Sequence, residues 1–345
     1  MTLTADTTPI AAGLLAYGMS GKLFHAPFLT QHPGFELRAV VERHQPRMAA
    51  DYPHIVSHPS TEALLADPTL ELVVVNTPND THYDLARQAL LAGKHVLVEK
   101  PVATTLAEWQ ELSELASQQG RQLLAYQNRR WDTDFEAVRR VVASGQLGRL
   151  IEVHVRFDRY RPALNPKVFK EDGRPGAGLL FDLGPHILDQ VISLFGRPLA
   201  YTKTAGSYRE HSQVDDFFSL HLRYPAGLHV WLASSTLVAD PGPAYILNGT
   251  RGSYRKGRTD PQEPQLLAGV KPLDPAYGHE QPGQEGRLTV AGPDGTLATT
   301  LDAAAPASYM GLFEAVYQAI RHGQPYPVTP EELAWQLEVL TSADA

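Results

Sequence analysis

The chain has 345 residues, and its 30 lysine and arginine residues against 38 aspartate and glutamate residues give a formal net charge of −8. At roughly 100–200 residues per domain, this length predicts two domains. Cysteine is absent, which excludes disulfides, thiolate metal sites, iron–sulfur clusters and cysteine nucleophiles. An acidic chain without a basic run is also a poor candidate for binding nucleic acid.

The start of the chain is polar. Residues 1–9 are rich in threonine and lack the basic and apolar regions of a secretory signal, so we expect a flexible tail. No stretch reaches the ~18–20 apolar residues that span a bilayer. We therefore expect a cytoplasmic protein without a membrane partner.

Residues 10–128 alternate short β-branched segments with helical ones. The expected strands are Ile10–Ala16, Phe35–Val41, Leu72–Asn76, His95–Val98 and Leu123–Tyr126. The expected helices Thr81–Ala92 and Thr105–Gln119 are each followed by a glycine, a common helix stop signal. This alternation predicts an α/β domain of the Rossmann type, with a doubly wound parallel sheet.

Residues 129–345 have a different pattern, which predicts an α+β domain with a large mixed or antiparallel sheet. After an expected helix at Asp132–Ser144, apolar and polar residues alternate over Ile151–Tyr160, as in a strand with one buried face. Two hairpins are expected, with strands at Phe217–Arg223, Leu228–Ser234, Arg287–Ala291 and Leu297–Leu301. Asp240–His279 is rich in glycine and proline and is expected to form long loops. Two helices close the chain, the last starting at Thr329-Pro330.

The first expected strand leads into a dinucleotide-binding pattern, G-x-G-x-x-G, with alanine in its first position. Its residues are Ala16, Tyr17, Gly18, Met19, Ser20 and Gly21. Gly18 lets the backbone approach a pyrophosphate, and Gly21 lets the following helix pack closely on the strand. The alternative is a strand–helix turn that only requires glycines. The context of strand, helix and second strand favours the dinucleotide site.

An acid and a base follow the second expected strand and point to different cofactors. Glu42 stands 21 residues beyond Gly21, near the spacing of an acid that binds the adenosine ribose hydroxyls of NAD. Arg43 comes next, and a guanidinium attracts the 2′-phosphate of NADP. The sequence leaves NAD and NADP both open.

Two further motifs carry candidate catalytic groups. Glu99-Lys100-Pro101 ends an expected parallel strand, where ligands of open α/β sheets bind, and Pro101 favours an extended or cis geometry at Lys100. Asp182 and His186 are four residues apart, so on a helix they share one face, and a carboxylate near an imidazole suits a general base. A structural Asp–His hydrogen bond and a surface lysine are the simpler alternatives for these residues.

Other chemistries lack their signatures. The zinc pattern H-E-x-x-H and the nucleophile elbow G-x-S-x-G are both absent, so we expect neither a metal site nor a serine nucleophile.

Four motifs occur together over residues 10–340. They are the Ala16–Gly21 turn, Thr77-Pro78-Asn79 with His82, Glu99-Lys100-Pro101, and the glycine-rich run into Asp182 and His186. In this order they resemble the Gfo/Idh/MocA family of NAD(P)-dependent sugar and polyol oxidoreductases. The resemblance implies that Lys100, Asp182 and His186 are catalytic. It also implies that Thr77, Pro78, Asn79 and His82 line the cofactor cleft, that Glu99 lies near the nicotinamide ribose, and that the C-terminal sheet builds homodimers or homotetramers.

Three shorter segments are similar to the subgroup that contains NADP-dependent scyllo-inositol dehydrogenases. They are Ser20–Pro27, Asn128–Asp132 and Arg159–Pro162. From these segments we expect Asn128, Tyr160 and Arg161 to contact substrate hydroxyls. Ala16 and Glu42 depart from the pattern, since Ala16 replaces a glycine and Glu42 replaces a smaller polar residue.

The resulting hypothesis is a dehydrogenase that moves hydride between NAD(P) and a secondary alcohol or ketone of an inositol-like polyol or sugar. Either His186 or Lys100 would accept the hydroxyl proton. The alternatives are a reductase of the same fold acting on a non-sugar carbonyl or a tetrapyrrole, and a non-enzymatic regulator that binds the nucleotide.

Overall fold

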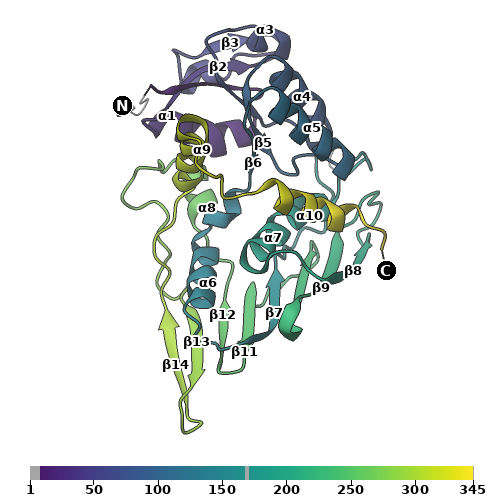
Figure 1. The fold of residues 1–345 in the computed structure, drawn as a ribbon, viewed down its shortest axis with the longest axis vertical. Coiled ribbons are helices and arrows are strands. Elements are labelled where there is room, and N and C mark those ends of the chain that lie inside the picture. The colour runs from purple at the N-terminus through teal and green to yellow at the C-terminus, as the bar shows by residue number, and fades with distance from the viewer. Residues whose placement is uncertain (1–7, 168–170, 345) are drawn as a thin grey trace. The chain divides into compact units, whose positions relative to one another are not determined.

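The computed structural model describes residues 8–167 and 171–344, so residues 1–7 of the expected tail lie outside the described part. The chain forms two compact units, each built around its own sheet (Figure 1). The first unit holds the described residues up to Asn128 together with Glu263–Tyr277 and Tyr309–Pro330. The second holds Arg129–Gln262, Gly278–Ser308 and the described residues from Glu331 onward. None of the helices in the described residues is long and apolar enough to cross a membrane.

The sheet of the first unit has six parallel strands in the order β3-β2-β1-β4-β5-β6, which confirms the expected doubly wound architecture. The strands are β1 (Ile10–Leu14), β2 (Phe35–Val41), β3 (Val56–His58), β4 (Leu72–Val75), β5 (His95–Glu99) and β6 (Leu123–Tyr126). Strand β3 was not expected from the sequence because its three residues are too short for a recognisable period. The strand order changes direction between β1 and β4, the place where such sheets bind ligands.

Helices cover both faces of this sheet. They are α1 (Ala26–Gln31), α2 (Met48–Asp51), α3 (Thr61–Leu65), α4 (His82–Leu91) and α5 (Leu106–Gln118). Figure 1 shows α4 and α5 together on one side and α1 on the other. The predicted helix Thr105–Gln119 is confirmed as α5, where Thr105 and Glu108 form a complete capping box.

The boundary of the first unit differs from a single cut after residue 128, because later segments return to it. Helix α9 (Met310–His322) packs on α1, where the rings of Phe28 and Phe313 stack at 5.2 Å. Arg321 forms an ion pair with Glu71 at 2.7 Å, and the Tyr326 hydroxyl donates to the carbonyl of Ala125 at 2.9 Å. These contacts join residues that are about 200–300 positions apart in the chain. Hydrophobic periodicity describes only neighbouring residues, so it cannot predict such contacts.

The second unit is built on a mixed sheet of eight strands in the order β14-β13-β12-β11-β7-β10-β9-β8. The strands are β7 (Leu150–Arg156), β8 (Ala200–Gly206), β9 (Phe217–Arg223), β10 (His229–Ser235), β11 (Tyr245–Gly249), β12 (Gly252–Lys256), β13 (Gly286–Ala291) and β14 (Leu297–Asp302). Only the pair formed by β7 and β10 is parallel among these neighbours. Both predicted hairpins, β9–β10 and β13–β14, are confirmed.

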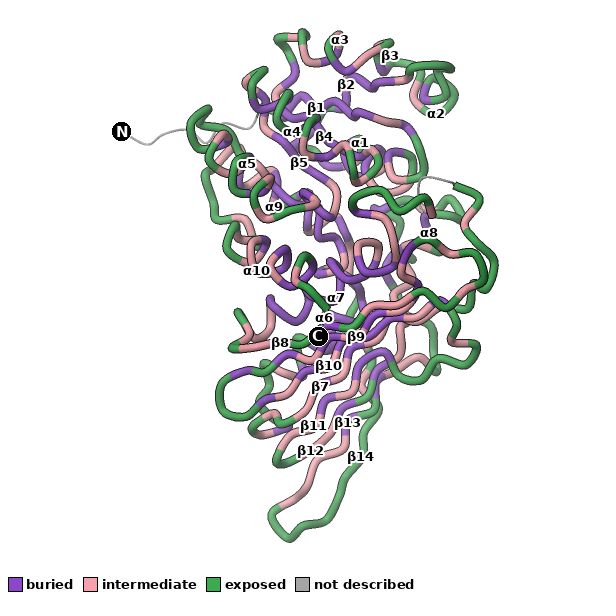
Figure 2. Tube along the Cα trace, turned by 90° about the vertical axis from the view of Figure 1, so that its right-hand side faces the viewer, coloured by how far each residue is buried: buried purple, intermediate pink, exposed green. Residues whose placement is uncertain are grey.

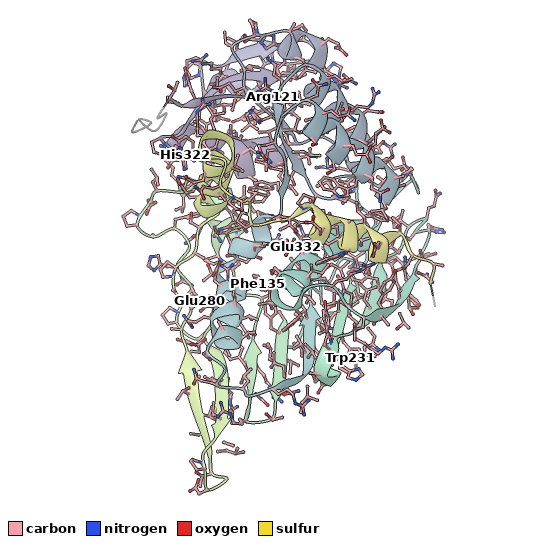
Figure 3. The ribbon with its side chains drawn as sticks, viewed as in Figure 1. Arg121, Phe135, Trp231, Glu280, His322 and Glu332 are labelled. Carbon is pink, nitrogen blue, oxygen red and sulfur yellow. The ribbon has the colours of Figure 1, made fainter. Side chains whose placement is uncertain are left out.

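One face of this sheet carries the core of the second unit. Helices α6 (Thr133–Ala143), α7 (Leu179–Phe195) and α10 (Pro330–Thr341) supply residues that pack with buried side chains of β7, β9, β10 and β11. Figure 2 shows buried and less buried residues alternating along these strands, as their period of two requires. Phe135 on α6, labelled in Figure 3, belongs to this core and is 1% exposed.

The expectation of long loops over Asp240–His279 was wrong. This segment contains β11, β12 and helix α8 (Gln262–Leu267). Its glycines mark the tight turn between paired strands instead of an irregular region: Gly249 ends β11 and Gly252 begins β12. A Cβ on Gly252 would lie 2.5 Å from the carbonyl oxygen of Thr289 on the neighbouring strand, so the close pairing needs glycine there.

Candidate functional site

The turn after β1 has the shape that a dinucleotide pyrophosphate needs. A Cβ on Gly18 would meet nothing within 4 Å, so the backbone there faces open space. A Cβ on Gly21 would lie 2.3 Å from the carbonyl oxygen of Ala16, which only glycine avoids. The chain continues as a single π-helical turn, Gly21–His25, before α1 begins. The turn therefore has room for a phosphate on one side and close packing on the other.

Asn76, immediately after β4, holds this turn in place. Its Nδ2 group donates to the carbonyl of Ala16 at 2.9 Å, and its Oδ1 atom accepts from the Ala16 amide at 3.0 Å. The sequence analysis placed Asn76 at the end of a strand without a role. A polar residue closing an apolar strand next to the switch point was the signal that could have identified it.

Tyr17 and Met19, two other residues of the turn, differ in their exposure to solvent. Tyr17 is buried, and its hydroxyl donates to Oδ2 of Asp51 at 2.7 Å, whereas Met19 is 56% exposed. Lys22 reaches the same Asp51 oxygen at 2.8 Å. These contacts tie the turn to α2.

The acid and the base after β2 are in different environments. Glu42 is half-buried, and its carboxylate accepts hydrogen bonds from the Arg47 and Met48 amides and from the Ser57 hydroxyl. Arg43 is exposed.

The loop after β4 contains Thr77, Pro78 and Asn79. The side chain of His82, the first residue of α4, contacts this loop. The His82 ring lies between two backbone carbonyls, with Nε2 2.9 Å from that of Thr77 and Nδ1 2.7 Å from that of Pro101. Burial lowers the pKa of His82, and the two carbonyls offset part of this shift. His82 therefore joins the Thr77 loop to the Lys100-Pro101 turn instead of presenting a free nitrogen.

Glu99 is the centre of a buried polar cluster at the end of β5. Its Oε1 atom accepts from the Ser20 hydroxyl at 2.5 Å and lies 3.0 Å from Nε2 of His25. Burial alone would raise the pKa of Glu99, but its contacts with His25, Ser20 and Lys100 outweigh burial and lower it. An ionised carboxylate thus stands between the fingerprint turn and Lys100. The role of His25 in this cluster could not be predicted from the sequence, because Glu99 lies 74 positions further along the chain.

Lys100 follows Glu99 directly, and the Lys100–Pro101 peptide bond is cis. The side chain of Lys100 is partly exposed, so it is accessible at the carboxyl end of β5.

In the second unit, α7 carries Asp182 and His186. The helix spans both residues, so their spacing of four places them on one face, as predicted. Asp182 is partly exposed, and its Oδ2 atom lies 3.5 Å from Nη1 of Arg159. His186 is buried, 6% exposed.

Asp215, 33 residues after Asp182, caps the start of this helix. Its carboxylate accepts from the Leu180 amide at 2.6 Å, and its backbone carbonyl accepts from the Leu179 amide at 2.9 Å. Burial raises the pKa of Asp215 to about 6. The sequence analysis missed this cap because the residue belongs to the segment before β9.

Three guanidinium groups surround the ring of Phe157 near this helix. Those of Arg129, Arg159 and Arg258 lie 5.0, 5.1 and 4.4 Å from the ring centroid. Arg159 is the member that also pairs with Asp182. This grouping could not be predicted from the sequence, since the residues come from three separate segments.

The expected substrate residues have unequal exposure. Tyr160 is 61% exposed and Arg161 is exposed, whereas Asn128 is 6% exposed. The described residues contain no group of three or more histidine, aspartate or glutamate side chains arranged to hold a metal ion.

Known families match both halves of the chain. Residues 10–127 match the oxidoreductase family with an NAD-binding Rossmann fold, and residues 135–255 match the Gfo/Idh/MocA C-terminal domain.

Similar proteins are known over nearly the full length. The uncharacterized oxidoreductase YdgJ of Escherichia coli is 37% identical, covering 96% of this chain and 94% of YdgJ. The scyllo-inositol 2-dehydrogenase (NADP(+)) IolW of Bacillus subtilis is 35% identical, covering 94% of this chain and 89% of IolW. The crystal structure of an oxidoreductase from Bacillus cereus superposes with a TM-score of 0.88 at 32% identity, covering 96% of this chain and 94% of that one.

These matches and the two sheets define an NAD(P)-binding oxidoreductase with a Rossmann domain. The chain belongs to the Gfo/Idh/MocA family and is an oxidoreductase.

Proposed function

We propose that this enzyme moves hydride between a nicotinamide cofactor and a secondary alcohol or ketone of a cyclic polyol or sugar of the inositol class. The observation that carries the proposal is the shared face of α7, which presents a carboxylate and an imidazole together, with Arg159 holding the carboxylate. The likeness to the inositol dehydrogenase IolW supports the substrate class.

The chain's own residues supply the acid–base chemistry of the proposal. When bound, the nicotinamide accepts the hydride from the substrate carbon. His186 takes the proton of the substrate hydroxyl, and Asp182 stabilises the imidazolium that results. Lys100 donates a hydrogen bond to the substrate oxygen and steadies the negative charge that develops on it.

The first unit would hold the cofactor. The turn from Ala16 to Gly21 takes the pyrophosphate, since Gly18 faces open space and Gly21 cannot be larger. Thr77, Pro78, Asn79 and His82 shape the loop beside it, and Glu99 lies at the end of β5 for the nicotinamide ribose. Asn128, Tyr160 and Arg161 are candidates for binding further substrate hydroxyls.

The test is reduction of NADP+ and NAD+ by a panel of inositols and pyranoses, together with oxidation of NADPH and NADH by non-sugar ketones. We expect His186→Ala and Lys100→Ala each to lower kcat by about 100-fold or more, within the range of lost acid–base catalysis. The exposed residues His279 and Lys271 provide matched controls, and His279→Ala and Lys271→Ala should keep wild-type rates.

Full activity of both active-site variants would refute the proposed roles. Turnover of the non-sugar ketones alone would refute the substrate class, and no turnover by a folded protein that binds the nucleotide would favour a regulator.

We also infer that the enzyme forms homodimers or homotetramers through the face of the eight-stranded sheet opposite its core. Four aromatic side chains stack on this face across three adjacent strands: His154, His221, His229 and Trp231. Trp231 is labelled in Figure 3.

A further inference from the structure

The carboxylate of Glu42, directly after β2, accepts three hydrogen bonds inside the first unit. Its Oε1 atom accepts from the amides of Arg47 at 2.7 Å and Met48 at 3.1 Å, and its Oε2 atom accepts from the Ser57 hydroxyl at 3.0 Å. Three donors from the next loop, α2 and β3 therefore hold both oxygens. Glu42 anchors the loop of residues 43–47.

This engagement removes the usual reason to expect NAD. An acid at the end of the second strand favours NAD by accepting from the ribose hydroxyls, and its charge repels a 2′-phosphate. The oxygens of Glu42 already accept from internal donors, and these donors offset part of the negative charge. A ribose hydroxyl would have to share these oxygens with the donors that hold the loop.

The loop that Glu42 anchors displays two cations. Arg43 and Arg47 are exposed, and within the described residues neither guanidinium forms an ion pair at 4.0 Å or less. Arg43 acts on Glu62, whose pKa is lowered mainly by the Ser60 hydroxyl and to a smaller extent by Arg43. The other acid of this region, Asp51, is already paired with Lys22.

The same loop is held beside the pyrophosphate turn. The Tyr17 hydroxyl donates to Asp51, the last residue of α2, and the rings of Tyr17 and Tyr52 meet edge to face at 6.5 Å. Helix α2 is therefore fixed at its start by Glu42 and at its end by Tyr17. Arg43 and Arg47 precede α2, in the loop that Glu42 joins to the start of this helix, so they belong to the segment that these contacts hold beside the turn.

We propose that the enzyme prefers NADP to NAD because Arg43 and Arg47 bind the 2′-phosphate while Glu42 serves as the anchor of their loop. The proposal rests on the assignment of the turn after β1 to the dinucleotide. Arginine suits the role because its planar guanidinium pairs with two phosphate oxygens at once and stays charged at all physiological pH values.

Binding of adenosine 2′,5′-bisphosphate and adenosine 5′-monophosphate, measured by calorimetry, tests the proposal without any turnover. The two probes differ only in the 2′-phosphate. We expect the full-length enzyme to bind the bisphosphate at least about tenfold more tightly. The double variant Arg43→Ala/Arg47→Ala should lose most of that difference and keep its affinity for the monophosphate within about threefold.

A matched control is Arg38→Ala, which removes a cation on β2 that is paired with Glu36. This variant should bind both probes like the wild type. Thermal unfolding of each variant shows whether a loss of binding reflects a loss of fold.

Glu42→Gln separates the two roles of the acid. If Glu42 is an anchor, the glutamine variant gains no affinity for the bisphosphate, and any loosening of the loop weakens both probes alike. A gain for the bisphosphate together with a loss for the monophosphate would overturn the proposal, because it would show that Glu42 contacts the ribose and repels the phosphate.

Two other results would also overturn it. Equal binding of both probes by the wild type would remove the preference but leave the proposed hydride transfer standing. Binding of neither probe would contradict the assignment of the dinucleotide site itself.

Discussion

At the scale of single residues, Gly18 and Gly21 have opposite surroundings, and this difference can be tested. Gly18→Ala adds a methyl group in open space, so the fold should keep its stability while nucleotide affinity falls by about tenfold or more. Gly21→Ala places a methyl group against the Ala16 carbonyl and should lower the free energy of unfolding by about 1–3 kcal/mol. Urea unfolding and nucleotide titration measure the two effects.

Gly145→Ala and Gly120→Ala are poor controls because both glycines have a positive φ. Gly242→Ala is a better one, since its added methyl group also meets nothing within 4 Å and it lies in the second unit. Unchanged nucleotide affinity in Gly18→Ala would contradict the placement of the pyrophosphate.

At the residue scale, the sequence could indicate the close packing at Gly21 because that backbone requirement is local. The glycines of the turn could be placed because a tight turn and a close packing contact each need glycine nearby in the chain. The partners of those residues could not be predicted: Asn76 lies 60 positions from Ala16, and the hydrogen bonds of Glu42 depend on how β3 pairs with β2.

At the scale of elements, the start of α7 depends on a carboxyl group with a raised pKa. In the folded protein the pKa of Asp215 rises from 3.8 to about 6 because of burial, so folding favours the protonated form. The contribution of this group to stability is therefore complete below about pH 4 and is lost as the pH rises through about 6.

Asp215→Asn removes this titration and keeps an oxygen acceptor for the Leu180 amide. Its free energy of unfolding relative to the wild type should rise by about 1–3 kcal/mol between about pH 4 and pH 7 and stay level above that range. Urea unfolding at several pH values measures the change.

Asp240→Asn changes an exposed aspartate of the same unit and should show no such pH dependence. Asp215→Ala loses the cap and should be less stable than Asp215→Asn by about 1 kcal/mol. A relative stability of Asp215→Asn that falls as the pH rises would contradict burial as the dominant influence on this group.

Helices and strands could be predicted well where the sequence showed both their hydrophobic period and the residues that start or end them. The capping box of Thr105 and Glu108 marks the start of α5 within four residues. Strands β11 and β12 were missed because they are five residues each and joined through glycines, so turn composition concealed their alternation.

At the scale of the whole molecule, the proposed assembly depends on the stacked face around Trp231. The ring of Trp231 lies 4.7 Å from that of His221 and 5.0 Å from that of His154. Val230 and Leu232, its neighbours in the chain, point to the core and are fully buried. Trp231→Glu should thus leave the core intact and convert oligomers to monomers, as light scattering after size-exclusion chromatography would measure.

Gln281→Glu adds the same charge at an exposed position outside this sheet face and should leave the molar mass unchanged. Oligomers of wild-type mass in Trp231→Glu would show that another surface joins the subunits.

The fold class of both units could be predicted because each sheet type has its own sequence period. It could not be predicted that two later segments belong to the first unit, Glu263–Tyr277 and Tyr309–Pro330. The apolar face of a helix shows that the helix packs on something, but it does not show which sheet that is.

The return of α9 to the first unit has a consequence for biosynthesis. Domains generally fold as units during synthesis, the N-terminal one first. Here the ring of Phe28 stays without Phe313 until the ribosome has added almost 300 more residues, and Glu71 stays without Arg321 for another 250 residues. The first unit therefore cannot complete its apolar core around Phe28 until most of the chain has been made.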